Sequence, residues 1–591
     1  MCGIVGFCSN KFYKENLKLM LTSISHRGPD DEGIYNHKNV WLGHRRLSIL
    51  DLSSLGHQPM ISRDERYIIT YNGEVYNFKK IKEDLINKGY EFNSNTDTEV
   101  ILNAFIEWGI DSFKKLDGMF AFVIYDKKKE ELYGIRDRYG IKPFYYITNS
   151  DGFFFSSEMK AFTYSNILKK REINFEVLDL YLTLRYVPGN KTMLKGVNKL
   201  MPGHFLKYSK NSFENKKYAS SNLEEKNGSN LVSKFDKKFS NAISKQMVSD
   251  VEVGAFLSGG LDSSYIVSKA SKISKGQLKT FSAGFKRDSE LPFAQKVSDK
   301  FNTTHKDFTL TSFHLDELKK IIWYLDEPIG DAAVIPTYKL SSMASKDVKV
   351  VLSGEGADEF LGGYKKYKTL LFLNKFRWIG KYLYFFIPEN KIQFQRLKLF
   401  MKAKNFNLAY FESTGVFSST EKKNLLKRKL KNNSLNIFKE NVNLNDMLMF
   451  DINNWLVDDL FLKNDKMTMA HSLESRVPFL DNDFIDFVSS LPLKLKIKGN
   501  EEKIILRRNL EKVLPEISKR EKHGFNVPTE DLLEIGKKIL TKKNIEKRNI
   551  FKWDFVKRLL ERDMKNGFYR RQFICILMFE LWCEVFIDEE N

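Results

Sequence analysis

Cys2 is the first residue of the chain whose type and position could carry chemistry. Once the initiator methionine is removed, the thiol and a free α-amino group belong to the same residue. An α-amine has a reference pKa of ~7.7–8.0, so it can act as the general base that activates the thiol as a nucleophile. The alternative is that Cys2 only opens a buried strand, Cys2–Phe7, and Cys2 alone favours this second interpretation.

A glycine- and serine-rich loop, Ser258–Ser264, is the second chemical feature. It follows an apolar strand, Val251–Leu257, and leads into a helix, Tyr265–Lys272. Backbone N–H groups at such a turn, with the positive end of the helix dipole, bind phosphate. The loop lacks the Gly-Lys-Ser/Thr ending of a Walker P-loop, so γ-phosphate transfer is not indicated. It resembles the pyrophosphate loop of enzymes that cleave ATP between the α- and β-phosphates.

A second strand and loop, Val348–Leu352 and Ser353–Phe360, carry acidic residues. Carboxylates beside bound phosphates require a compensating cation. We therefore expect Asp262 and Asp358 to bind Mg²⁺, which would help to neutralise ATP. Glu359 is better interpreted as a carboxylate in the first turn of a helix.

The elements that would position these residues change in character along the chain. Residues 1–205 contain short β-type segments separated by Gly, Asn and Asp. From residue 231 onward, apolar strands alternate with amphipathic segments of helical length, which indicates a parallel sheet flanked by helices. The C-terminal third is mainly helical in pattern. Residues 206–230 are polar and predict a linker, so the predicted division is 1–205, 206–230 and 231–591.

Four segments of the N-terminal part occur in a recognisable order and spacing. They are His26–Gly33, Gly43–Ile49, Tyr71–Asn77 and Ser94–Glu99. With Cys2 they resemble the glutaminase domain of the N-terminal-nucleophile amidotransferases, over nearly all of residues 2–205. The resemblance implies an α+β fold of αββα layers. It also implies that Cys2 attacks the side-chain amide of glutamine, forms a γ-glutamyl thioester and releases ammonia.

The same resemblance implies roles for five further residues. Asn72 and the backbone N–H of Gly73 would form the oxyanion hole, since acyl transfer needs donors fixed before the charge appears. Arg46 would bind the α-carboxylate of glutamine, a task suited to a planar bidentate donor. Asp97 would bind the α-amino group, and Glu74 would contact the polar end of the substrate.

The remainder, to about residue 535, resembles the glutamine-hydrolysing (class B) asparagine synthetase family. Beside the two loops, the matching segments are Asp326–Asp331, Asp465–Ala470, Glu474–Asp481 and Lys519–Phe525. The resemblance implies an α/β ATP-pyrophosphatase domain of the adenine nucleotide α-hydrolase (HUP) type with a helical C-terminal part. Glu355 would act on the amino acid or as general base for ammonia, and Lys522 would stabilise pyrophosphate and developing charge. The implied ATP-binding residues are Leu257, Ser258, Gly259, Gly260, Asp262, Ser263, Ala283, Ser353 and Gly354. Lys503 opens a helix and is expected at the surface.

The two sites imply one reaction. The side-chain carboxylate of aspartate attacks the α-phosphate of ATP, giving β-aspartyl-AMP and pyrophosphate. Ammonia from Cys2 then passes through a channel between the domains and displaces AMP. The alternative is a member of the family that acts on another carboxylate, such as a uronic-acid sugar in surface polysaccharide synthesis. A β-lactam- or macrolactam-forming relative needs no external ammonia, so the intact glutaminase set argues against it.

The net charge of +21 raises the question of a nucleic-acid partner. The lysines are scattered among Asn and Ile rather than gathered on one Arg-rich face, so we expect small-molecule substrates and no specific nucleic acid. Four cysteines are too few for a disulfide framework, and Cys575 and Cys583 read as core residues. With no signal peptide evident, the chain is expected in the cytoplasm. The family resemblance implies a homodimer.

No stretch reaches the ~18 uncharged residues of a membrane span. Leu370–Ile387 comes nearest, but Lys375, Arg377 and Lys381 interrupt it. A packed helix is the preferred interpretation, and contact with a membrane surface is the alternative.

Overall fold

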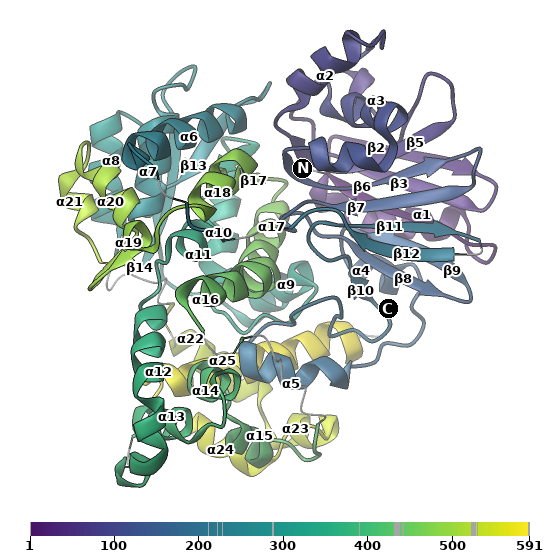
Figure 1. Ribbon diagram of the computed structural model, residues 1–591. Coiled ribbons are helices and arrows are strands. Elements are labelled where there is room, and N and C mark those ends of the chain that lie inside the picture. The colour runs from purple at the N-terminus through teal and green to yellow at the C-terminus, as the bar shows by residue number, and fades with distance from the viewer. Residues whose placement is uncertain are drawn as a thin grey trace.

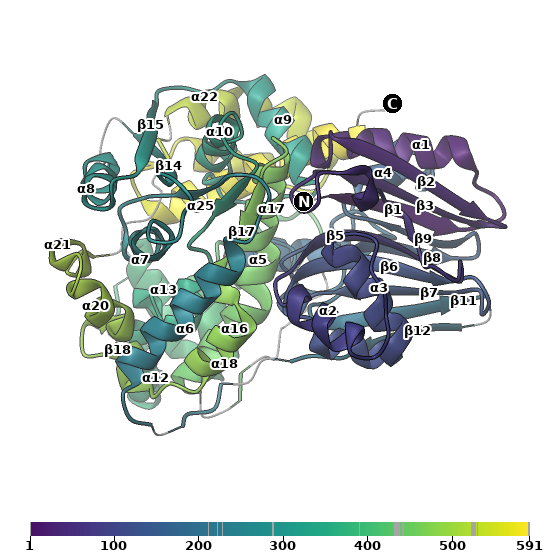
Figure 2. The ribbon, with the colours of Figure 1, turned by 90° about the horizontal axis from the view of Figure 1, so that it is seen from above.

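In a computed structural model, the chain forms two lobes that lie side by side (Figures 1 and 2). The structure describes residues 2–210, 212–220, 223–226, 228–285, 289–388, 391–430, 438–439, 442–521, 527–528 and 530–588. The N-terminal end of the chain lies between the lobes in both views, so Cys2 sits at their boundary.

The N-terminal lobe consists of two six-stranded antiparallel sheets, ordered β10-β8-β9-β1-β3-β2 and β12-β11-β7-β6-β5-β4. The strands are β1 (Gly3–Cys8), β2 (Asp31–His37), β3 (Val40–Arg46), β4 (Met60–Ile61), β5 (Tyr67–Val75), β6 (Gly118–Asp126), β7 (Glu131–Arg136), β8 (Tyr145–Asn149), β9 (Gly152–Ser156), β10 (Asn198–Lys199), β11 (His204–Ser209) and β12 (Ser212–Lys217). Alternate side chains of both sheets, such as Ile4, Ile68 and Val123, form a shared apolar core between them.

Helices cover the two outer faces of these sheets. α1 (Lys14–Ser23) packs on the β1 sheet, while α2 (Phe78–Ile86) and α3 (Asp97–Trp108) pack on the β5 sheet. The predicted αββα layering is thus confirmed. Residues 206–217, which we expected in the linker, instead form most of the β11–β12 edge hairpin. Every residue of β12 is exposed, which explains why its sequence is as polar as that of a linker.

The second lobe is built on five parallel strands ordered β15-β14-β13-β16-β17. They are β13 (Val253–Phe256), β14 (Lys279–Phe285), β15 (Thr304–Leu310), β16 (Val350–Leu352) and β17 (Glu474–Arg476). Because β13 has β14 on one side and β16 on the other, the chain order reverses between β13 and β16. In open α/β sheets, ligands bind at this point, outside the carboxyl ends of the strands.

Helices cover both faces of this sheet. They include α6 (Leu231–Gln246), α7 (Leu261–Ala270), α8 (Leu291–Phe301), α9 (Leu315–Leu325), α10 (Val334–Ala344) and α11 (Ala357–Leu361). In α6, Phe235, Phe239 and Ile243 recur every four residues and form the buried stripe. The predicted parallel sheet with flanking helices is confirmed.

The C-terminal third is mainly helical, as predicted. Its helices are α12 (Lys365–Leu383), α13 (Ile392–Lys402), α14 (Phe406–Thr414), α15 (Ser419–Leu425), α16 (Leu444–Phe450), the π-helical η5 (Asp451–Phe461), α17 (Leu462–Met469), α18 (Asn482–Ser489), α19 (Leu493–Lys496), α20 (Ile504–Glu511), α21 (Pro515–Ser518), α22 (Glu530–Ile539), α23 (Lys542–Arg548), α24 (Trp553–Leu560) and α25 (Gly567–Cys583). α25 packs against α5 (Phe175–Leu184) and α9, and its Cys575 and Cys583 are buried, as expected of core residues.

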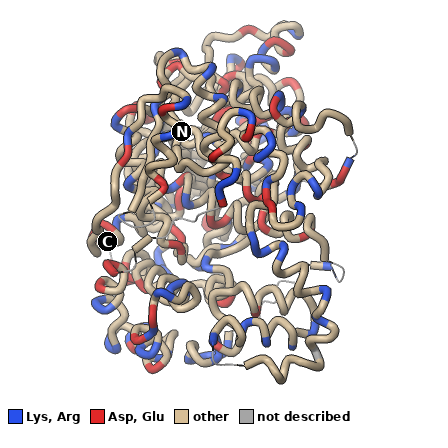
Figure 3. Tube along the Cα trace, turned by 90° about the vertical axis from the view of Figure 1, so that its left-hand side faces the viewer, with Lys and Arg blue, Asp and Glu red and all other residues tan. Residues whose placement is uncertain are grey.

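Two bulk properties bear on partners. Lys and Arg are interspersed with Asp and Glu on the side of the molecule that Figure 3 shows, rather than gathered into one basic face. Within the described part of the chain, every helix falls short of the length and apolar character that crossing a membrane requires.

Candidate active sites

The structure brings the predicted glutaminase residues together in one small cavity. Cys2, Arg46, Gly73, Glu74 and Asp97 line a space of about 40 Å³. These residues come from the start of β1, the end of β3, β5 and the start of α3. Such a volume holds roughly one water molecule.

Asn72 lies directly beside Cys2 and is fully buried. The backbone nitrogen of Cys2 donates a hydrogen bond to Asn72 Oδ1 at 3.0 Å. Asn72 Nδ2 is buried and has no hydrogen-bond partner among the described residues. A buried donor without a partner is costly and calls for an explanation. The neighbouring Gly73 leaves no room for a side chain, because an added Cβ would collide with the carbonyl of Met119 on β6.

Arg46 is held by the chain that follows β3. Its guanidinium donates to the carbonyl of Ser53 at 2.9 Å and also to that of Asp51. Gly56 packs against the guanidinium so closely that a Cβ there would collide with it. The loop therefore fixes the direction of Arg46 through backbone contacts.

Two carboxylates in the cavity have raised pKa values. Burial raises the pKa of Asp97 to about 6, although hydrogen bonds from the Tyr71 hydroxyl (2.6 Å) and the Val75 N–H (2.9 Å) to its Oδ2 oppose the shift. Burial also raises the pKa of Glu74, whose Oε2 lies 3.2 Å from Nη2 of Arg476. Both groups are thus placed where a cation would stabilise the ionised form.

The phosphate loop joins β13 to α7, and Asp262 and Ser263 lie in the first turn of that helix. Gly259 has φ +71°, a conformation that favours glycine, and a Cβ there would lie 2.6 Å from the backbone nitrogen of Ala294. The Ser258 hydroxyl accepts from the N–H of Gly260 at 3.2 Å and lies 3.0 Å from the Ser263 hydroxyl.

The other residues of the predicted ATP site adjoin this loop. The Leu257 N–H donates to the carbonyl of Phe281 on β14 (2.9 Å), the strand that also carries Ala283. Gly354 faces α7, since an added Cβ would lie 3.1 Å from Cβ of Asp262. The Ser353 N–H donates to the carbonyl of Arg476 at 2.8 Å, which ties this loop to β17.

Lys503 is the main correction at this site. It is buried, not at the surface, and its Nζ lies 2.6 Å from both Asp262 Oδ2 and Asp358 Oδ1. The two predicted metal ligands therefore converge on one cation, and their oxygen atoms are of the type that Mg²⁺ prefers. The donor set fits the ion, provided that Lys503 yields to it.

Glu355 lies in the loop before α11, and its charge acts electrostatically on a buried cluster of ionic groups. Burial lowers the pKa of Lys463, but Asp331, Asp459 and Glu355 raise it above its ordinary value. Lys463 Nζ lies 3.1 Å from Asp331, which is also 3.3 Å from Arg185. This buried cluster therefore carries both signs of charge.

Lys522 lies outside the described residues. Its neighbour Arg520 does reach the phosphate loop: it donates to the carbonyl of Gly259 at 2.5 Å and pairs with Glu290 at 3.1 Å. We did not single out Arg520 from the sequence, although the segment Lys519–Phe525 already pointed to this place in the chain.

Strand β17 touches both sites. Glu474 lines the Cys2 cavity, and Arg476 bonds to Glu74 on one side and, through its carbonyl, to Ser353 on the other. Glu474 and Arg476, only two residues apart, therefore contact the Cys2 cavity and the loop beside the predicted ATP site.

Buried ion pairs also join the lobes close to Cys2. Arg27 donates to the carbonyl of Cys2 at 3.1 Å and lies 2.9 Å from Asp465 on α17. Lys142 lies 3.7 Å from the same carboxylate. Breaking such a buried pair typically costs ~3–5 kcal/mol, so these contacts fix the relative position of the two lobes.

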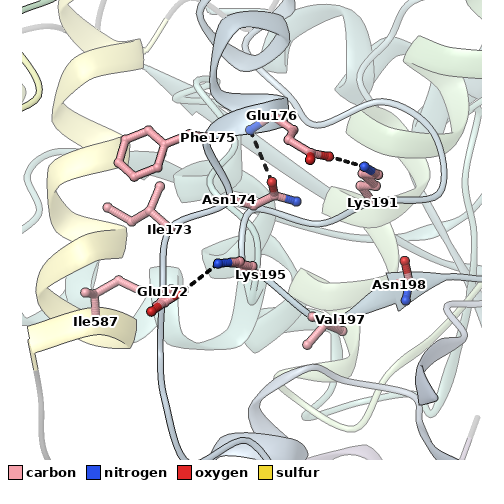
Figure 4. A pocket seen from close by; sticks show the side chains of 11 residues that line it. Glu172, Ile173, Asn174, Phe175, Glu176, Lys191, Lys195, Val197, Asn198 and Ile587 are labelled. Atoms are coloured by element: carbon pink, nitrogen blue, oxygen red, sulfur yellow. Dashed lines mark hydrogen bonds and ion pairs between the residues drawn. The ribbon is translucent and has the colours of Figure 1, made fainter. Parts of the chain in front are cut away.

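A cavity of about 790 Å³ lies elsewhere, beside α5 and the end of the described chain (Figure 4). Its two lysines already pair with glutamates, Lys195 with Glu172 at 2.8 Å and Lys191 with Glu176. Neither predicted site includes its lining residues.

The fold and the two sites define a glutamine-dependent amidotransferase coupled to a synthetase. Family models match accordingly: "Glutamine amidotransferase domain" over residues 1–219 and "Asparagine synthase" over residues 234–584. The chain belongs to the asparagine synthase family, and it is a ligase that uses ATP as a co-substrate.

Curated relatives agree with this family. The chain is 35% identical to asparagine synthetase (glutamine-hydrolyzing) 1 of Bacillus subtilis, with 100% of this chain and 97% of the relative covered. It is 41% identical to putative asparagine synthetase (glutamine-hydrolyzing) 2 of Methanocaldococcus jannaschii, with 65% and 79% covered. A third relative, asparagine synthetase (glutamine-hydrolyzing) 3 of B. subtilis, is 32% identical, with 87% and 85% covered.

Proposed function

We propose that the chain converts aspartate, glutamine, ATP and water into asparagine, glutamate, AMP and diphosphate. The observation that carries this proposal is β17, whose residues contact the Cys2 cavity and the loop beside the ATP site. A shared strand supports coupling of two reactions, not merely their presence on one chain.

At the first site, the Cys2 thiol attacks the glutamine side-chain carbonyl, with its own α-amine as base. Asn72 Nδ2 and the Gly73 N–H receive the developing oxyanion, and the lack of another partner for Nδ2 supports this role. Ammonia leaves as the γ-glutamyl thioester forms, and water later releases glutamate. Arg46 holds the α-carboxylate of glutamine, while Asp97 and Glu74 hold its amino end.

At the second site, the phosphate loop Ser258–Ser263 binds ATP through its N–H and hydroxyl groups, together with Leu257, Ala283, Ser353 and Gly354. Asp262 and Asp358 would hold Mg²⁺, which supplies positive charge to the phosphates. Lys503 and Lys522 supply further cations as pyrophosphate departs. The convergence of both carboxylates on one lysine supports this arrangement.

The acceptor is an amino acid in this proposal. An α-amino acid presents an ammonium and a carboxylate, so its binding site needs groups of both signs. Groups of both signs lie together here: the carboxylates of Asp331 and Asp459, and the cations of Arg185 and Lys463. The charge of Glu355 acts on Lys463. The aspartate side chain forms β-aspartyl-AMP, and ammonia attacks it with Glu355 as base or positioning group.

Ammonia passes between the lobes along the interface that Arg27, Lys142 and Asp465 form beside Cys2. We further propose that two copies form a homodimer, which light scattering would test. A reducing cytoplasm suits the chain because all four cysteines are free.

The test compares wild type with Cys2→Ala and, as matched control, Cys8→Ala on the same strand. We expect Cys2→Ala to lose asparagine formation from glutamine and to keep it from ammonium, with AMP formed in step. Cys8→Ala should keep both. Glutamine hydrolysis without asparagine, but with amidation of an added uronic acid, would replace aspartate by a sugar acid as acceptor.

A further inference from the structure

A helical hairpin on the second lobe carries side chains that neither site uses. It consists of α12, the short helix η4 (Tyr384–Phe386) and α13. Its exposed large apolar residues, here called the aromatic patch, are Phe372, Phe376, Trp378, Tyr382, Leu383, Phe385, Phe386 and Phe394. Figure 1 shows the hairpin on the side of the molecule away from the N-terminal lobe.

The aromatic patch concentrates exposed rings in one place. Seven of the ten exposed aromatic side chains among the described residues belong to it. Phe386 is 82% exposed, Tyr382 77%, Phe385 68% and Trp378 67%. Single exposed apolar residues are ordinary, whereas a contiguous patch marks an interaction site.

Helix geometry places the rings of α12 on two adjoining sides of its exposed half. Phe372, Phe376 and Leu383 recur at helical spacing, as do Trp378 and Tyr382. The ring centroids of Phe372 and Phe376 lie 5.0 Å apart. A further side of α12 packs on α13, where an added Cβ on Gly380 would collide with Met401. The hairpin thus buries one face against itself and turns the aromatic face outward.

The hairpin is also strongly basic. Residues 365–387 contain Lys365, Lys366, Lys368, Lys375, Arg377 and Lys381, and no Asp or Glu. Three of these lysines, at the start of α12, pair with acidic residues: Lys365 with Glu521 (2.8 Å), Lys366 with Asp451 (2.7 Å) and Lys368 with Glu502 (3.1 Å). Lys375, in contrast, is exposed between Phe372 and Phe376. Lys375 therefore places a positive charge within the aromatic patch.

We propose that the α12–α13 hairpin binds the surface of a membrane that contains anionic lipid. Trp and Tyr rings favour the boundary between headgroups and acyl chains, Phe and Leu enter the apolar layer, and Lys meets the anionic headgroups. α12 carries too many charged residues to cross the bilayer, so in this proposal it lies in the interface. The proposal is independent of the reaction described above.

A second copy of the chain is the competing occupant of the aromatic patch. A two-fold interface sets the same surface of each copy against itself. Here that would bring Lys375 of both copies together beside the aromatic patch, and residues 365–387 contain no Asp or Glu to pair with it. An anionic bilayer supplies the opposite charge, so the composition favours the membrane over self-association.

The test is flotation of the full-length protein with vesicles of phosphatidylcholine alone or mixed with phosphatidylglycerol. We expect binding to the mixed vesicles only, weakened by added salt. Phe385→Ser with Phe386→Ser should lower the bound-to-free ratio about tenfold, and Lys375→Gln about fivefold. The matched control, Ile86→Ser with Ile110→Ser, removes exposed apolar side chains of the N-terminal lobe and should bind like wild type.

Absence of binding to the mixed vesicles, or an equal loss in the control, would overturn the proposal. So would a dimer, seen by light scattering, that the Phe385/Phe386 double variant dissociates while vesicles bind neither protein. All variants should keep glutamine hydrolysis in solution. If the double variant loses it through misfolding, Lys375→Gln decides, because that exposed side chain leaves no cavity when shortened.

Discussion

The glutaminase and synthetase sites satisfy their polar groups in opposite ways. The Cys2 cavity is small, and the adjacent Asn72 has a buried donor, Nδ2, without a partner among the described residues. At the ATP site, the two carboxylates are already satisfied by a protein cation, Lys503. We infer that the first site is preorganised for charge that appears only during the reaction. The second is arranged to exchange one cation for another when substrate arrives.

The largest expected effect tests whether the Cys2 site is preorganised for the developing charge. Asn72→Ala removes the unpartnered donor, so glutamine hydrolysis should fall ~10²–10³-fold, as when an oxyanion-hole donor is lost. Synthesis from ammonium should persist at the wild-type rate. The measurements are glutamate release and asparagine formation. Asn77→Ala, two residues beyond β5, is the control, and equal losses in both variants would contradict the role.

The second prediction tests the exchange of cations. Lys503→Met removes the ammonium group that lies 2.6 Å from both Asp262 and Asp358, so Mn²⁺ should bind the ATP-free protein roughly 10–100-fold more tightly. Two unit charges ~4 Å apart repel by about 4 kcal/mol near a protein surface, less with salt screening. Electron paramagnetic resonance of free Mn²⁺ measures the affinity. Lys368→Met, which loses only its pair with Glu502, is the control. An unchanged affinity in Lys503→Met would show that the carboxylates are not the metal ligands.

The smallest effect concerns the pH dependence of glutamine binding at the Cys2 site. Asp97 has a pKa of about 6, raised by burial from 3.8, and only its ionised form attracts the ammonium of glutamine. The KM for glutamine should therefore rise about fourfold between about pH 7 and about pH 5.5, with kcat at saturation less affected. Asp97→Asn should give a high KM that does not change over this range. A wild-type KM that stays constant would remove Asp97 from substrate binding.

The raised pKa of Asp97 also makes the free energy of unfolding depend on pH. The direction is opposite to that of a carboxylate whose pKa is lowered by folding. Between its unfolded value near 3.8 and its folded value of about 6, the folded state holds more protons at Asp97. The contribution of this group to stability is therefore greatest at low pH and falls as pH rises through that window.

Much of the fold could be predicted because local pattern and tertiary structure agree. The apolar segments Val251–Leu257 and Val348–Leu352 contain β13 and β16, and the loops after them meet as the parallel topology requires. The β11–β12 hairpin could not be told from a linker, because an exposed edge strand has no apolar alternation.

The sites divide in a similar way. Residues carried by a motif, such as Arg46 and Asp97, reach the expected cavity. Lys503 could not be placed, because a lysine at a helix start is usually solvated. Its burial depends on Asp262 and Asp358, which are distant in the sequence. Glu474 was missed as a residue of the Cys2 cavity for the same reason: nothing local indicates which lobe a strand end faces.

The position of β17 has a consequence for separating the lobes. In chain order they look like modules that could be cut apart between residues 219 and 234. Yet the first lobe alone would lack Glu474 from its substrate cavity and would leave Glu74 without Arg476. An N-terminal lobe expressed alone would therefore have an altered Cys2 cavity. Chimaeras within the family should transplant the strand Glu474–Arg476 together with the N-terminal lobe that it completes.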